Sequence, residues 1–417
     1  MKKSHKIILF LCVILYSFNF TLYLIYETPK PSSTSRLTDY FSAEKIAIGK
    51  QYFNQRVIIS LSAFFIKIGL LFWLYKSKKW EKITDYFIRK IKKSFFCHLL
   101  YTFTLSFFVF GLLLLPLNLI SYFHLISYKI IITPFFLFVK DFFISVSIFS
   151  LGASIIAAVG IRLYQYKQKL FPYLATLFVL IFAFFLMVIY PIFITPLFND
   201  FSRLNHPELE NKINALFHER GMKIKNLYVV NASRRTLGAN AYVSGLGPTK
   251  EIVLYDTLLK DYNIDEIVNI VAHELGHYEK HHIIVGIFTM PLSNPFAILA
   301  FFLFLTWVIK KNEKEEQSLI NQIPFILFIV LIAFQLSMPL TNAISRRMER
   351  DADYFSLSIT KNPSAFISSQ VKLSSKHYYT NYDPNSFFKM LYYSHPSVKE
   401  RIEMALGKQR ILHGERQ

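Results

Sequence analysis

The stretch "IVAHELGHYEKHH", residues 270–282, carries two histidines four positions apart, His273 and His277, with Glu274 directly after the first. Residues four apart point in the same direction on an α-helix. The residues upstream repeat apolar side chains at the spacing of a half-buried helix. We therefore expect a helix that presents two imidazoles on one face. The apolar positions that predict this helix are Ile264, Ile267, Val268, Val271 and Leu275.

This spacing suits a zinc hydrolase, because His273 and His277 can bind one metal ion while Glu274 reaches a water beside it as general base. Such a motif arises by chance in roughly one chain of this kind in a hundred, so it needs support from other residues. The alternative is a helix with incidental surface histidines. We interpret His281 and His282 in that way and assign them no role.

A catalytic zinc needs a third protein ligand. In "SRRMERDADYF", Glu349 and Asp353 are again four apart on one predicted helix, residues 345–358. Glu349 is the candidate zinc ligand, and Asp353 is a candidate to orient a ligand histidine or to move a proton. The alternative is a solvated acidic face. Its ion-pair partners would be Arg346, Arg347 and Arg350.

The composition indicates a polytopic membrane protein with a sizeable water-exposed part, because 53% of the 417 residues are hydrophobic and the mean hydropathy is +0.34. The net charge of +20 does not favour nucleic acid as a partner, since basic loops that flank apolar spans account for it. Only Cys12 and Cys97 occur, and both lie in or beside apolar segments, which argues against a disulfide framework.

Seven segments are long and apolar enough to cross a bilayer, which takes about 20 residues. The first resembles a signal peptide, but no small-residue cleavage site follows it, so we expect a retained span. The run at 130–139 is too short to cross and is expected at an interface or as a re-entrant segment. Lys67 inside the second span favours a water-accessible interior. The predicted spans are 7–26, 57–75, 98–122, 142–161, 173–198, 283–309 and 322–341.

The polar stretch 199–282 predicts an amphipathic helix at 206–221 that ends at a glycine. Strands are expected at "NLYVVNA" and "EIVLYDTLL", and "ANAYVSGLG" (239–247) looks like a strand that runs into a glycine-rich turn.

Four motifs, in order, resemble peptidase family M48, and in particular its Ste24-type CaaX prenyl protease members. They are "ANAYVSGLGPTKEIVLYDTLL" (239–259), "VAHELGHYEKHH" (271–282), "SRRMERDADYFS" (345–356) and "YYSHPSVKERI" (392–402). Four ordered motifs are much more specific than the histidine pair alone.

The resemblance implies a role for each matching position. His273, His277 and Glu349 match the zinc ligands, with one zinc ion per chain, and Glu274 matches the general base. Asp353 matches an acidic residue that orients a ligand or donates a proton. The remaining matches are His395 and Arg401, as an imidazolium and a guanidinium that steady the oxyanion and the substrate, and Asn240, Ala241 and Tyr242, on an edge strand that binds the substrate backbone.

The resemblance also implies a mainly α membrane protein, in which seven transmembrane helices enclose a chamber beside a zincin-like α+β protease domain with a small β-sheet. We expect an N-terminal membrane domain at 1–198, with five spans, and an M48 peptidase domain at 199–417, with the other two. The expected substrate is a peptide or protein, prenylated or otherwise associated with the bilayer. No nucleic acid partner is expected, and the oligomeric state is left open.

The chain is expected in the cell membrane of a prokaryote or the endoplasmic reticulum membrane of a eukaryote. Two features of the sequence predict opposite orientations in the membrane. The basic loop at 76–97 shares a side with the N-terminus, and the positive-inside rule puts both in the cytoplasm and the peptidase region outside. The resemblance places the peptidase region in the cytosol instead, and we follow it.

Two alternatives stay open. An HtpX-like quality-control protease would keep the same site but has fewer spans before the histidine motif. A non-catalytic membrane binding or scaffold protein would keep the fold without turnover, against which the intact Glu274 argues.

Overall fold

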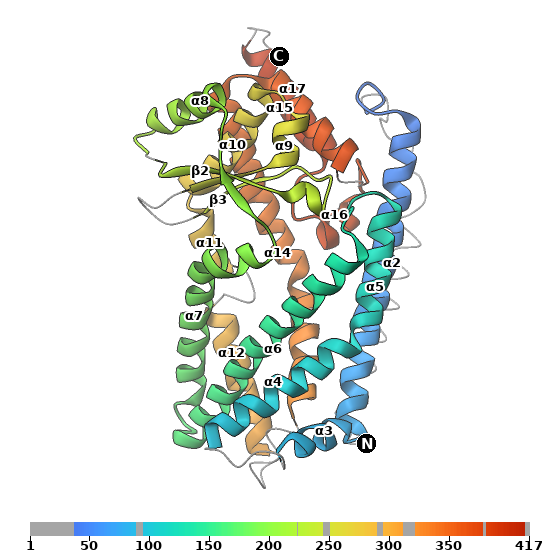
Figure 1. Cartoon of the computed structure of the whole chain (residues 1–417), viewed down its shortest axis with the longest axis vertical. Helices are drawn as coiled ribbons and strands as arrows, with labels where there is room; N and C mark the ends of the chain where they lie inside the picture. The colour runs from blue at the N-terminus through green and yellow to red at the C-terminus, as the bar shows by residue number, and fades with distance from the viewer. Residues whose placement is uncertain are drawn as a thin grey trace.

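A bundle of long helices forms one half of the molecule, and a small sheet with the C-terminal helices covers one end of that bundle (Figure 1). The mainly α fold with a small sheet agrees with the sequence prediction. The computed structural model describes residues 37–88, 95–222, 224–244, 251–289, 295–311, 322–377 and 381–412.

Four described helices are long and apolar enough to cross a membrane, and three further apolar helices are shorter. The predicted span at 7–26 lies outside the described residues. The four long helices are α2 (Ala43–Lys76), α4 (Phe95–Leu113), α6 (Phe135–Tyr166) and α14 (Ile323–Thr360). The shorter ones are α5 (Leu115–Ser127), α7 (Phe171–Ile189) and α12 (Pro295–Lys311), and the amphipathic α3 (Lys79–Ile88) follows α2.

The predicted single span at 98–122 is wrong, because the chain breaks at Leu114 into α4 and α5. Pro116 occupies the first turn of α5, where its missing N–H costs no helical hydrogen bond, but it ends the regular hydrogen bonding of the preceding helix.

The last predicted span, 322–341, does not end where its apolar run ends. It continues as α14 to Thr360, so the span and the charged motif at 345–358 form one helix of 38 residues. Pro339 lies inside this helix, and proline is tolerated within membrane helices more readily than in soluble ones. One rigid element therefore leads from the bundle to the acidic motif.

Two other spans are more broken than predicted. The segment 173–198 is α7 followed by a π-helical turn, η2 (Tyr190–Ile194), and a 3-10 turn, η3 (Thr195–Leu197). The segment 283–309 comprises α11 (His282–Thr289) and α12, with residues 290–294 outside the described part. The run at 130–139 forms a β-bridge from Ile131 to Thr236 and then the first turn of α6.

The sheet has four strands in the order β1-β2-β4-β3, with β2 and β4 parallel and the outer pairs antiparallel. β3 is therefore an edge strand. The predicted strand "EIVLYDTLL" ends at Tyr255, and its last residues begin helix α9 (Asp256–Asp261). The strands are β1 (Phe201–Arg203), β2 (Asn226–Val230), β3 (Ala241–Ser244) and β4 (Glu251–Tyr255).

One apolar core joins the sheet to α8 (Pro207–His218) and to α10 (Ile264–Glu279), the helix that carries the histidine motif. Burial of Val271 and Leu275 fixes which face of α10 looks inward. Gly221 ends the α8 region with a positive φ of 66°, as the sequence predicted.

The C-terminal helices pack on the end of α14 and close the site from the other side (Figure 1). They are α15 (Pro363–Lys372), the π-helical turn η6 (Leu373–His377), α16 (Ser386–Tyr392) and α17 (Val398–Leu412), and the short 3-10 turn η4 (Ala232–Arg234) completes the described elements.

Candidate active site

The start of α10 is fixed by a capping box. The Asn263 side chain accepts a hydrogen bond from the Glu266 amide at 2.9 Å, and the Glu266 carboxylate accepts one from the Asn263 amide at 2.8 Å. Lys372 and Ser368 on α15 also donate to the buried Glu266 carboxylate, at 2.6 and 2.5 Å. The register of the histidine helix is thus tied to the C-terminal helices.

α10 and α14 approach each other closely at Gly276. A Cβ added there would lie 3.0 Å from the Ala352 Cα, so the helix pair needs glycine at this position. Ser356 donates a hydrogen bond to the Asn269 carbonyl, and Thr360 donates to the Asn269 side-chain oxygen, both at 2.8 Å. These contacts set the spacing between the two helices that carry the predicted ligands.

His273, His277 and Glu349 converge on one point. Their candidate ligand atoms all lie within 4.8 Å of one another. The two Nε2 atoms are 3.1 Å apart, and the Glu349 carboxylate lies 3.2 Å from Nε2 of His273 and 3.4 Å from Nε2 of His277. The structure therefore brings together the three side chains that the sequence analysis selected.

These residues fit a metal ion. Atom Oε2 of Glu349 is buried, and no hydrogen bond between described residues satisfies it, although Nε2 of His273 lies 3.2 Å away. Two imidazoles and a carboxylate that face a common point form a donor set suited to zinc, with room for a further ligand in a catalytic site. A cation among them would satisfy the carboxylate oxygen and replace the close contact between the two ring nitrogens.

Asp353 lies behind the candidate metal ligands and is fully buried. Its Oδ1 is 2.8 Å from Nδ1 of His273, and the Arg401 guanidinium contacts both carboxylate oxygens, with Nε to Oδ2 at 2.8 Å. Burial lowers the pKa of His273, but the neighbouring Asp353 and Glu349 carboxylates outweigh it and raise the pKa to about 10. Asp353 is thus positioned to orient His273, and Arg401 to balance the charge of Asp353.

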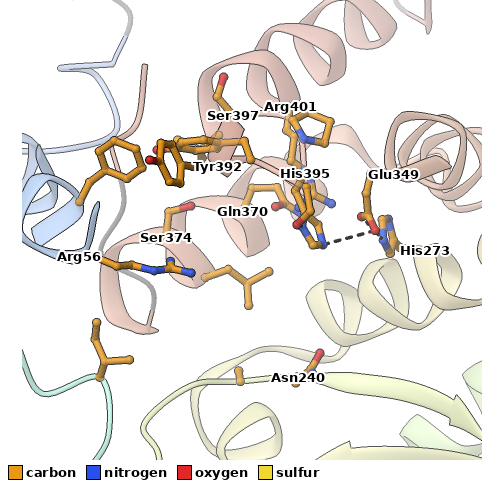
Figure 2. A pocket seen from close by; sticks show the side chains of 18 of the residues that line it. Arg56, Asn240, His273, Glu349, Gln370, Ser374, Tyr392, His395, Ser397 and Arg401 are labelled. Carbon is orange, nitrogen blue, oxygen red and sulfur yellow. Dashed lines mark hydrogen bonds and ion pairs between the residues drawn. The ribbon is translucent and has the colours of Figure 1, made fainter. Parts of the chain in front are cut away.

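His395 reaches the site from the loop before α17, and its Nε2 lies 3.3 Å from Oε1 of Glu349 (Figure 2). Although 57% of the side chain is exposed, partial desolvation of the ring lowers its pKa below the usual value, against the opposing effect of Glu349. The imidazolium expected at this position stays a prediction, and the ring can donate an N–H in either charge state. A neutral imidazole still carries one N–H donor.

Glu274 lines the cavity beside the ligand cluster. Burial raises the pKa of its carboxyl group, and the nearby histidines oppose this effect only in part. A carboxyl group whose pKa lies closer to neutrality is better suited to accept and return a proton during catalysis.

His282 is part of the cluster, although the sequence analysis assigned it no role. Its side chain is buried, and its Nδ1 lies 2.9 Å from Nδ1 of His277, on the opposite side of that ring from the ligand atom. Burial lowers the pKa of His282, which favours a ring that can accept a hydrogen bond from His277. The turn at His281, with a φ of 53°, directs the next residue back toward α10. The turn geometry alone distinguishes His282, which reaches the cluster, from His281, which does not. The sequence spacing did not predict this difference.

The three predicted strand residues do not share one environment. Asn240 lines the cavity and its side chain lies near the site (Figure 2), whereas Ala241 and Tyr242 are not among the cavity-lining residues. Ala241 is buried against the core with α10, and Tyr242 packs on the other face of the sheet. Burial raises the pKa of Tyr242 to about 12. Only the backbone edge of β3 remains available for strand addition.

Two family models match the chain along nearly all of its length. Residues 203–409 match the model of peptidase family M48, and residues 23–200 match that of the CAAX prenyl protease N-terminal region, which has five membrane helices.

Two curated relatives are identical to this chain at about a third of the aligned positions. An uncharacterized metalloprotease, YhfN, from Bacillus subtilis (strain 168) is 34% identical over 232 residues, 54% of this chain and 53% of that protein. CAAX prenyl protease 1 from Saccharomyces cerevisiae is 32% identical over 244 residues, 52% of this chain and 51% of that protein. The chain thus spans about half the length of the curated relatives it matches.

A solved structure shares the fold over almost the whole chain. The crystal structure of S. mikatae Ste24p matches with a TM-score of 0.78 and 23% sequence identity, and the match covers 94% of this chain and 96% of that one.

Proposed function

Because the chain belongs to peptidase family M48, and it is an integral membrane protein, we propose that it is a zinc endopeptidase embedded in the bilayer. The observation that carries the proposal is the convergence of His273, His277 and Glu349 within 4.8 Å beside the Glu274 carboxyl group. The proposed substrates are membrane-associated polypeptides, including prenylated proteins cut near their C-termini.

In this proposal His273, His277 and Glu349 hold one zinc ion, which when bound polarises the scissile carbonyl and activates water. Glu274 accepts the proton of the attacking water and returns it to the leaving amine. His395 donates its N–H to the developing oxyanion. The β3 edge at Asn240 binds the substrate backbone as an added strand.

The residues behind the ligands hold them in place. Oδ1 of Asp353 lies 2.8 Å from Nδ1 of His273, so that Nε2 faces the metal position, and Arg401 keeps Asp353 ionised. His282 accepts from Nδ1 of His277 in the same way. We propose that Arg401 acts through Asp353 and not directly on the substrate.

The match of residues 23–200 to a five-helix CAAX region favours a CAAX-type protease over the HtpX-like alternative. The domain boundary near residue 199, the host membrane and a cytosolic site remain predictions. Reporter fusions at both ends of the chain would test the orientation.

The function is tested by incubating the purified protein in detergent with farnesylated and unmodified C-terminal peptides and identifying the products by mass. We expect cleavage at one bond near the C-terminus. A Glu274→Gln variant purified in parallel reports any contaminating protease. If the wild type releases no product from either peptide while it contains zinc, the scaffold alternative replaces the protease.

A further inference from the structure

One cavity of about 650 Å³ connects the candidate active site to the membrane bundle. Its volume lies in the range of pockets that enclose a small ligand or a short peptide. One wall is the predicted catalytic machinery, with His273, Glu274 and Glu349. The wall formed by α2 contributes Tyr52, Phe53, Arg56, Val57, Ser60 and Leu61.

Arg56 stands out on the α2 wall because it is a charged side chain on a helix long enough to span the membrane. Figure 2 shows the guanidinium projecting into the cavity on the side away from Glu349 and His273. No ion pair between described residues involves Arg56. Arg401, the other cavity-lining arginine, is instead held by Asp353.

The surroundings of Arg56 position the guanidinium without neutralising it. Tyr52 lies one helical turn before Arg56 on α2 and also lines the cavity. The Tyr52 ring stacks on His124 at 5.1 Å and meets the edge of Tyr128 at 5.0 Å, and the Tyr128 hydroxyl donates to Gln55 at 3.0 Å. Among the described residues, the acidic ones that line the cavity are Glu349 in the ligand cluster and Glu274 beside it.

Arg56 lies one residue before the predicted span 57–75 and its side chain is exposed, so the charged guanidinium keeps contact with water where it faces the cavity. The planar guanidinium matches a carboxylate through two parallel hydrogen bonds. The cavity therefore has a cleavage site at one wall and an anion-binding group at another.

We propose that Arg56 binds the C-terminal carboxylate of the peptide substrate, and this rests on the proposed protease function. A polypeptide laid along β3 with its scissile bond at the ligand cluster has its C-terminal residues inside the cavity. Arg56 would then select substrates that end shortly after the cleavage point, and it would set where the cut falls.

The test compares two peptides of the same sequence, one with a free C-terminal carboxylate and one with a C-terminal amide. For the wild type we expect kcat/KM to be about 10- to 100-fold higher for the carboxylate, the effect of a hydrogen-bonded charge. In Arg56→Gln this ratio falls to about one, and in Arg56→Lys it is restored in part. Arg162→Gln, a matched change on α6 outside the cavity lining, keeps the wild-type ratio.

The outcomes separate this proposal from the protease function. If the wild type cleaves neither peptide, the protease function fails. If it cleaves both at equal rates, or if Arg56→Gln keeps the preference for the carboxylate, the Arg56 assignment is overturned while the protease function stands. Zinc content and the unfolding temperature of each variant identify a folding defect, and a ratio of two rates is independent of the folded fraction.

Discussion

The helix pairs α10–α14 and α4–α6 each meet at a glycine, but they meet in different ways. At Gly276 an added Cβ would reach the Ala352 backbone, whereas at Gly111 it would reach the Val146 side chain, with Cγ1 at 2.5 Å. The α10–α14 pair is joined further by the buried links of Asn269 and Asp353. Backbone contact and buried polar links leave one relative position for the site helices.

The membrane pair depends on side-chain packing. Thr104 and Ser154 share a hydrogen bond of 2.8 Å between α4 and α6, and both hydroxyls also contact carbonyls of their own helices. Small residues and hydroxyl contacts are typical of helix association in a bilayer, where apolar burial gives little advantage. The comparison indicates that the relative position of two helices is fixed most tightly for the pair that carries the candidate ligands.

The largest effect is expected from changes within the ligand cluster itself. Glu274→Gln removes the proton acceptor but no ligand, so kcat should fall about 10²- to 10⁴-fold while zinc stays bound. His273→Ala should lose both zinc and turnover. Metal analysis of the two proteins beside peptide cleavage separates the roles. Equal zinc loss in both variants would make Glu274 part of metal binding.

The glycine comparison can be tested with one substitution at three positions. Gly276→Ala forces backbone atoms apart and should destabilise the protein by about 1–3 kcal/mol, with weaker zinc binding. Gly111→Ala should cost stability without changing zinc affinity, because it lies away from the ligand cluster. Gly160→Ala on α6, where an added Cβ meets nothing within 4 Å, should be neutral or slightly stabilising. Thermal unfolding in detergent and zinc titration measure both quantities. Similar zinc affinities for the Gly276 and Gly111 variants would break the comparison.

A smaller effect is expected behind the ligands. His282→Asn should weaken zinc binding about 10- to 100-fold, because His277 loses the partner that orients its ring. His281→Asn is the matched control, since the neighbouring His281 is exposed and should keep wild-type affinity. Competition with a chelator measures the affinities. Equally weakened zinc binding in both variants would show that the turn at His281, and not the His282 ring, supports the site.

The smallest effect concerns Glu400 on α17, near the site. Burial raises its pKa, but hydrogen bonds from Ser397 and Lys389 outweigh burial and lower it overall. A carboxyl group with a lowered pKa in the folded state stabilises the protein at pH values above its unfolded-state pKa. This stabilisation is lost as the pH falls through the folded-state pKa. Glu400→Gln should therefore unfold slightly earlier at pH 7, and the difference should shrink as pH falls below the unfolded pKa of about 4.3 and vanish below the lower folded-state pKa. A stability difference between the two proteins that grows in acid would show that the Glu400 pKa is raised and not lowered.

The sequence predicted helices and strands well where the spacing of apolar residues followed a single helical or strand period. The histidine helix, the amphipathic α8 and the strand β2 follow from apolar spacing and were correctly expected. Helix ends in the membrane were predicted poorly. Hydropathy marks where lipid ends and not where hydrogen bonding ends, so α14 ran past its apolar stretch, and Pro116 divided a run that looked continuous.

The sequence by itself determined the histidine pair and its glutamate, because residues four apart on a helix share a face whatever surrounds them. Only the tertiary structure decided the rest of the site. Glu349 meets the pair because Gly276 lets α14 approach, and His282 reaches His277 because the chain turns at His281. Arg56 faces the same cavity from more than two hundred residues away. Contacts across such distances depend on how helices pack, and no local period encodes them.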